Sequence, residues 1–130
     1  ELEAQNWETR LDDIIADAKE VEGLKLVTQN IPEKSVDDLK KIADIVRKKI
    51  DTGVGVLVSV QDDKPALVVV VSDQARDKYD LKAGDLALEL GKILGGGGGG
   101  RPHMATAGGR KPDKIPAMFD KLPAIIKNKI

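Results

Sequence analysis

The chain has 130 residues, 41% apolar and 33% charged, with one histidine and no cysteine. These values are typical of one globular domain, and the lack of cysteine excludes a disulfide framework, a thiol nucleophile and Cys/His zinc sites. No apolar run is long enough to span a bilayer and no secretory signal pattern opens the chain, so we expect a cytoplasmic location, no membrane contact, and no cofactor or metal.

The net charge of −1 conceals a strong separation of charge along the chain. Residues 1–23 carry eight acids against two bases, whereas residues 92–130 carry eight bases against two acids. A local surplus of positive charge attracts anionic partners. We therefore expect an anionic partner to meet the segment 92–130.

The first segment predicts an amphipathic helix over residues 2–22 that ends at Gly23. Its apolar residues recur in steps of three and four, which is the spacing of a coiled-coil seam. A single helix that packs on its own domain has the same pattern, so both interpretations stay open. An acidic helical pattern at residue 1 also suggests a piece of a longer chain. The seam positions are Ala4, Trp7, Leu11, Ile14, Ala18 and Val21.

The rest of the chain predicts an α/β domain with a small mixed sheet flanked by helices. Alternating, branched residues indicate strands, and the run ALVVVVS is apolar on both faces, as in a central strand. Ser35 has the spacing of a helix cap, and Pro123 predicts a kink or a split in the last helix. The predicted strands are 24–31, 54–60 and 66–72, and the predicted helices are 36–50, 74–79, 83–93 and 113–129.

Six consecutive glycines predict a glycine-rich loop over residues 95–109. Arg101-Pro102 follow the run where a P-loop needs Lys and then Ser or Thr, and a helix precedes it where a dinucleotide fingerprint needs a strand. Polyglycine alone indicates a flexible linker, but the apolar helix that follows must pack on the same core. We therefore interpret the loop as a cradle whose backbone N–H groups closely approach an anion or a flat base.

The stretch GGGGGGRPHMATAGG, preceded by ALVVVVSDQARDKYDLKAGDLALELGKIL, resembles the C-terminal domain of alanyl-tRNA synthetase. The globular part of that domain is also appended to DHH-type phosphodiesterases. The resemblance covers residues 24–130. It centres on Gly98-Gly99-Gly100-Arg101-Pro102, Met104-Ala105 and Ala107-Gly108-Gly109, with Lys82-Ala83-Gly84 and Leu86 upstream.

Three positions inform the comparison with this family. Related phosphodiesterases usually carry a histidine where Arg101 stands, which favours the synthetase branch. The family often has an acid in place of His103 and a glutamine in place of Thr106. Contacts of these two side chains therefore do not carry over from the family.

The resemblance implies an accessory tRNA-binding module with no catalytic site of its own. Residues 1–23 would be the end of a helical subdomain, through which members commonly dimerise, and residues 24–130 the globular nucleic-acid-binding domain. In the family this domain contacts the outer corner of tRNA and links aminoacylation with editing. The expected partners are alanine-specific tRNA, the synthetase's own aminoacylation and editing domains, and a second copy through residues 2–22.

Two other functions remain open from the sequence. One is a protein-interaction or dimerisation module that acts through residues 2–22. The other is the substrate-binding domain of a DHH-type phosphodiesterase, which would need a metal-binding partner domain upstream.

The candidate binding residues are the glycines of the loop and the basic residues beside them. Arg101 can pair with phosphate through two hydrogen bonds or stack on a base. The structural alternatives are that it caps helix carbonyls or pairs with a nearby acid such as Asp85. The bases that follow the loop are individually typical solvated charges and together a candidate phosphate track. The full set is Gly98, Gly99, Gly100, Arg101, Gly108, Gly109, Arg110, Lys111 and Lys114.

Overall fold

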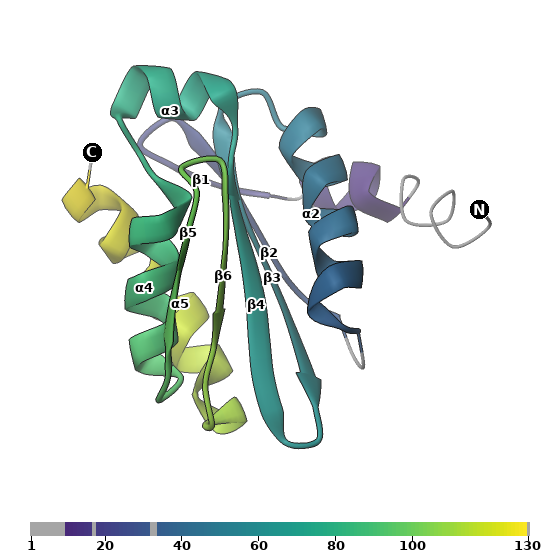
Figure 1. Ribbon diagram of the computed structural model, residues 1–130. Coiled ribbons are helices and arrows are strands. Elements are labelled where there is room, and N and C mark those ends of the chain that lie inside the picture. Colours follow the sequence, from purple (N-terminus) through teal and green to yellow (C-terminus); the bar gives the residue numbers. More distant parts are fainter. Residues whose placement is uncertain (1–9, 17, 32–33, 130) are drawn as a thin grey trace.

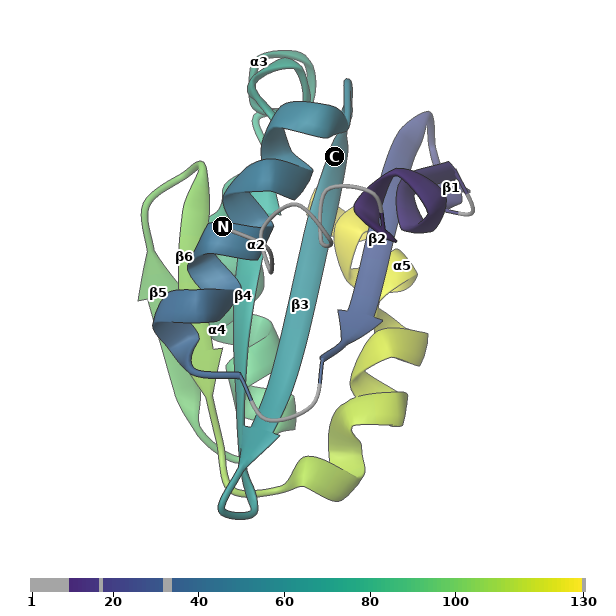
Figure 2. The same cartoon turned by 90° about the vertical axis from the view of Figure 1, so that its right-hand side faces the viewer.

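The computed structural model describes residues 10–16, 18–31 and 34–129. They form a six-stranded mixed sheet with the strand order β1-β2-β3-β4-β6-β5. Helix α2 lies on one face of this sheet, and helices α4 and α5 lie on the other (Figures 1 and 2). The predicted α/β fold with a small mixed sheet is therefore confirmed. Within the described residues, no helix has both the length and the hydropathy needed to cross a membrane.

The amino-terminal segment is only partly helical. Residues 10–16 form a helix, and strand β1 (Lys19–Val21) then pairs antiparallel with β2 (Leu24–Asn30). The predicted helix over residues 2–22 is therefore wrong for its last turn.

Gly23 allows a hairpin turn here and does not end a helix. Glu22 and Gly23 have φ values of 52° and 86°, which are the left-handed values of a two-residue type I′ turn. Residues 1–9 and 17 of the predicted helix and coiled-coil seam lie outside the described residues. The predicted domain boundary at residue 23 stays a prediction.

The apolar residues of this segment are divided between two cores. Leu11 and Ile15 are buried beside α2, whereas Val21 is buried in the core on the other face of the sheet. One straight helix cannot place apolar side chains in the cores on both faces of the sheet. Because residues 19–21 form strand β1 at the sheet edge, Val21 reaches the core opposite α2. Ile14 and Ala18 are half-buried against the core beside α2, so the described seam residues pack on their own domain.

The centre of the domain follows the predicted order of elements. Helix α2 (Val36–Lys49) begins after Ser35, whose hydroxyl accepts a hydrogen bond from the Asp38 N–H at 3.2 Å. Strand β3 (Gly53–Gln61) pairs parallel with β2 and antiparallel with β4 (Lys64–Val71). These elements confirm the predicted helix and strands.

Strand β4 is the central strand that its sequence predicts, because it lies between β3 and β6. Val68 and Val70 point toward α2, and we call this side of the sheet the α2 face. Leu67, Val69 and Val71 point toward α4 and α5, and we call that side the α4 face. All five side chains are fully buried, so the sheet separates two hydrophobic cores.

Three helices complete the carboxyl-terminal half beside the short 3₁₀ turn η1 (Pro112–Lys114). They are α3 (Asp73–Tyr79), α4 (Ala83–Ile93) and α5 (Ile115–Lys129). Helix α5 continues through Pro123, which excludes a split, and the alternative of a kink at Pro123 stays a prediction. Buried residues on both sides of the proline, among them Met118 and Ile126, anchor the helix in one core and offset the missing hydrogen bond.

The predicted glycine-rich loop over residues 95–109 is in fact a β-hairpin at the edge of the sheet. Strand β5 (Gly97–Gly100) contains only glycine and pairs antiparallel with β6 (Met104–Gly108). Figure 1 shows this hairpin running alongside α4, with its tip near α3.

Contact with α4 explains why the chain accepts glycine in this strand. A Cβ atom on Gly98 would lie 2.8 Å from the carbonyl oxygen of Ala87 in α4. A Cβ atom on Gly91 would lie 2.7 Å from the carbonyl oxygen of Gly97. The backbones of helix and strand therefore touch directly, and a side chain at either position has no room.

The outer positions of β5 have a different environment. Side chains alternate between the two faces of a strand, and Gly97 and Gly99 lie on the α2 face because they pair with Gly108 and Thr106. Among residues 10–16, 18–31 and 34–129, no atom lies within 4 Å of a Cβ atom placed on Gly97 or Gly99. The packing of this chain therefore explains Gly98 and leaves Gly97 and Gly99 unexplained.

This alternation predicts opposite effects of two neighbouring substitutions. Gly98→Ala should lower the free energy of unfolding by about 1–3 kcal/mol, because its Cβ overpacks the contact with α4. Gly99→Ala should leave that free energy unchanged or raise it by up to about 1 kcal/mol, because alanine restricts the unfolded chain. Urea unfolding followed by circular dichroism measures both variants. Equal losses of unfolding free energy would contradict the alternation of β5 positions between the two faces of the sheet.

Candidate nucleic-acid interface

Arg101 lies at the tip of the β5–β6 hairpin, beside a cavity of about 340 Å³. Arg101 is exposed to solvent. The tip is fixed in place, because the Pro102 carbonyl accepts a hydrogen bond from the Ala83 N–H at 2.9 Å, at the start of α4. The carbonyl of His103 accepts a second one from the Val71 N–H at 3.1 Å.

The cavity opens on the α2 face of the hairpin, and we call it the hairpin cavity. On strand β6, Ala105 and Ala107 are buried on the α4 face, whereas Met104 and Thr106 on the α2 face are only half-buried. Helix α2 therefore covers this part of the sheet incompletely. The hairpin cavity is lined by Lys40, Gly99, Gly100, Arg101, His103, Met104, Ala105 and Thr106.

The predicted site residues fall into two groups at opposite ends of strand β6. Gly99, Gly100 and Arg101 adjoin the tip, whereas Arg110, Lys111 and Lys114 follow the other end of β6, before α5 (Figure 1). The fold therefore does not bring Arg101 together with the predicted phosphate track, and a binding role for either group stays a prediction.

The second group, which we call the basal cluster (Arg110, Lys111 and Lys114), has a clear structural setting. The N–H groups of Arg110 and Lys111 both donate to the Leu94 carbonyl at 2.9 Å, just after the end of α4. Positive charge near a helix carboxyl terminus is favourable. A Cβ atom on Gly109 would collide with the same carbonyl, so packing accounts for this glycine.

Lys40 is a lining residue that sequence reasoning missed. It belongs to α2, far from the glycines in sequence. In the sequence it looks like any exposed charged residue on the polar side of a helix. Within residues 10–16, 18–31 and 34–129, neither Lys40 nor Arg101 forms an ion pair with a carboxylate. The alternative pairing of Arg101 with Asp85 is therefore absent from the described residues.

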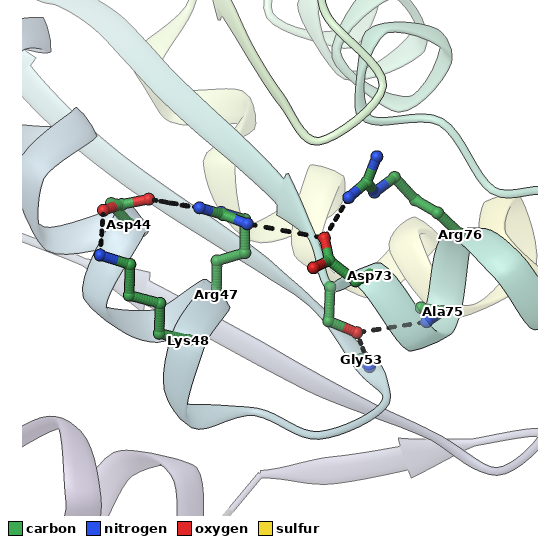
Figure 3. Close-up of polar contacts among 8 residues, drawn as sticks. Asp44, Arg47, Lys48, Gly53, Asp73, Ala75 and Arg76 are labelled. Atoms are coloured by element: carbon green, nitrogen blue, oxygen red, sulfur yellow. Dashed lines mark hydrogen bonds and ion pairs between the residues drawn. The ribbon is translucent and has the colours of Figure 1, made fainter.

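A network of charged side chains joins α2 to α3 (Figure 3). Arg47 Nη2 donates to Asp44 Oδ1 at 2.9 Å, and its other terminal nitrogen lies 3.6 Å from Asp73 Oδ1. Lys48 Nζ lies 3.2 Å from the second oxygen of Asp44, and Arg76 binds Asp73. Hydrogen bonds from Arg47 and then from Lys48 hold the pKa of Asp44 below its ordinary value.

Buried Ser72 supports the same junction. Its hydroxyl oxygen accepts hydrogen bonds from the N–H groups of Gly53 at 3.0 Å and Ala75 at 3.3 Å. The first contact ties the start of β3 to the end of β4, and the second caps α3. Helix α3 is thereby held at the same end of the sheet as the hairpin tip (Figure 1).

The lowered pKa of Asp44 predicts a pH-dependent stability difference. The ionised carboxylate stabilises the fold above its unfolded pKa of about 3.9, and this contribution disappears as the pH falls through the lower folded value. Asp44→Asn should therefore lower the free energy of unfolding at pH 7, by less than about 1 kcal/mol because the pair is partly exposed.

Urea midpoints of wild type and Asp44→Asn at pH 7 and near pH 2 measure this effect. The two proteins should converge at the lower pH. Asp51→Asn, at an exposed position outside the network, serves as the control. A difference that is the same at both pH values would contradict an electrostatic role for Asp44.

Comparison with known proteins places this fold in a family. Residues 23–128 match the DHHA1 domain model, and the chain therefore belongs to the DHHA1 domain family. The C-Ala domain of alanyl-tRNA synthetase from Aquifex aeolicus superposes with a TM-score of 0.78 at 33% identity. That match covers 85% of this chain and 97% of the C-Ala chain, so within the family this chain groups with C-Ala domains, and the resemblance seen in the sequence is confirmed.

Curated relatives agree with this grouping. The chain is 36% identical over 129 residues to the alanine–tRNA ligase of Natranaerobius thermophilus, and 42% identical over 125 residues to that of Salinibacter ruber. These alignments cover 99% and 93% of this chain. The chain spans only 15% and 13% of the length of these relatives.

The fold is also shared more widely. A pGpG-specific phosphodiesterase from Vibrio superposes with a TM-score of 0.57 at 16% identity, over 99% of this chain and 42% of that chain. An identity this low shows a common fold only.

Proposed function

We propose that this chain is the tRNA-binding C-terminal module of an alanyl-tRNA synthetase. Its similarity to the Aquifex aeolicus C-Ala domain supports this assignment. The observation that carries it is the exposed Arg101, which backbone hydrogen bonds fix at the hairpin tip and whose side chain has no carboxylate partner among the described residues. A guanidinium in this position is available to a phosphate.

The wider role proposed for the module is to contact the outer corner of tRNA and to link aminoacylation with editing. The chain is an accessory domain in this proposal, and the chemistry belongs to other domains of a cytoplasmic synthetase. Its small share of the relatives' length supports that division of labour. Its partners would then be alanine-specific tRNA and the synthetase's own aminoacylation and editing domains.

The basic side chains at the two ends of the hairpin define how an RNA would lie on the domain. Arg101 marks one end of the hairpin, and the basal cluster marks the other. A rigid RNA surface that spans the hairpin would contact both groups at once. Each phosphate contact then contributes to a salt-dependent affinity.

Dimerisation through residues 2–22 remains a prediction of the sequence, without support from the described residues. Leu11 and Ile15 are buried within their own domain and are not available to a second copy. Sedimentation velocity over a range of protein concentrations tests the dimer directly. One monomeric species throughout would remove it.

Binding of labelled tRNA with the alanine anticodon tests the proposed function. Affinity should fall steeply with salt, and Arg101→Ala should reduce the magnitude of the log–log salt slope by roughly 0.7–0.9 because one phosphate contact is lost. Lys127→Ala removes an exposed charge from α5, which packs on the opposite face, and should leave the slope unchanged. Fluorescence anisotropy provides the measurement.

Two results would contradict the assignment. The first is an affinity that does not change between low and high salt. The second is equal weakening by Arg101→Ala and Lys127→Ala, which would indicate general charge attraction without a defined site.

A further inference from the structure

The hairpin cavity combines three features that no single segment of the sequence provides. Its positive charge comes from two elements, because Lys40 belongs to α2 and Arg101 to the hairpin tip. Its floor includes Gly99, where a Cβ atom would meet no atom of the described part of the chain within 4 Å. Its volume of about 340 Å³ lies at the lower end of the roughly 300–1,000 Å³ typical of small-ligand sites.

The acids nearest to Lys40 along α2 are engaged elsewhere. Asp44, one turn later on the same side of the helix, is paired with Arg47 and Lys48. Asp37 and Asp38 lie in the first turn, where the positive end of the helix dipole stabilises them. Because no carboxylate of the described residues pairs with Lys40 or Arg101, their charges are left for a ligand.

We propose that the hairpin cavity is the phosphate-binding centre of the RNA surface. Lys40 and Arg101 hold one phosphodiester from two sides, and the adjoining ribose lies against the backbone at Gly99. This inference rests on the proposed tRNA-binding function. It adds Lys40 as a binding residue, a backbone phosphodiester as the bound group, and the α2 face as the side of the sheet where RNA lies. The bound strand lies on the α2 face of the hairpin, since the α4 face is occupied by α4 itself.

This proposal explains a feature that packing leaves open. Gly98 is required by contact with Ala87, but no atom of the described residues requires glycine at position 99. A side chain at position 99 would project into the cavity, because this residue lines it and faces the α2 side. Glycine at this position keeps the floor low enough for a ribose to touch the peptide backbone.

Two matched pairs of variants test the cavity by anisotropy titration with the same labelled tRNA. Lys40→Ala should weaken binding about fivefold at 100 mM salt and reduce the magnitude of the salt slope by roughly 0.7–0.9. Lys41→Ala, the next residue of α2, is exposed and outside the cavity lining, and should leave both quantities unchanged. Gly99→Leu should weaken binding about tenfold, whereas Gly97→Leu, on the same face but outside the lining, should stay within about twofold of wild type.

Crosslinking gives an independent readout, because the chain has no native cysteine. Lys40→Cys and Lys41→Cys, each labelled with a photoactivatable azide, place one reactive group on α2. The label at position 40 should crosslink to the tRNA, and the label at position 41 should give little product. Circular dichroism and urea unfolding verify that each variant is folded.

The possible outcomes separate this inference from the proposed function. If Arg101→Ala weakens binding while Lys40→Ala and Gly99→Leu bind as wild type does, the hairpin cavity is not the site, although the chain still binds tRNA. If the wild-type chain shows no salt-sensitive binding, both proposals fail. Equal crosslinking from positions 40 and 41 would also overturn the assignment to the cavity.

Discussion

The direct contact between the backbones of helix α4 and strand β5 sets the geometry of the β5–β6 hairpin and the position of its tip. Gly91 faces Gly97 across this contact, and Gly84 faces the carbonyl of Gly100, where a Cβ atom would approach to 2.8 Å. Because the two elements lie so close together, the start of α4 reaches the Pro102 carbonyl and fixes the tip. The position of Arg101 therefore depends on two glycines of α4, Gly84 and Gly91, that lie outside the lining of the hairpin cavity.

Most elements could be predicted because their sequence patterns agree with their packing. The unbroken apolar run of β4 indicates a strand buried on both faces, and the periodicity of α2 indicates a helix with one buried face. Polyglycine carries no such pattern, since glycine is a poor strand former in isolation. Strand β5 is ordered by its contact with α4, which is a tertiary effect. The first helix was predicted too long because Val21 fits helical spacing and also serves as the buried residue of an edge strand.

The candidate site was predictable only where sequence neighbours are also neighbours in space. Arg101 directly follows the glycines, and the fold keeps it beside Gly99 in one cavity. Arg110 and Lys111 also follow glycines, but strand β6 carries them to the other end of the hairpin. Lys40 could not be identified, because only the docking of α2 on the sheet brings it to the cavity. A pattern of charge along the chain shows where positive charge accumulates without showing which charges meet.

The bare backbone at Gly99 also affects the entropy of binding. Immobilising a flexible side chain at an interface opposes association by about 0.5–1.5 kcal/mol. A floor of peptide groups, held between β6 and α4, has no rotamers to lose. Contact at this position therefore leaves the conformational entropy of the protein almost unchanged. Of the groups proposed to hold the phosphodiester, only Lys40 and Arg101 give up side-chain freedom when a ligand arrives.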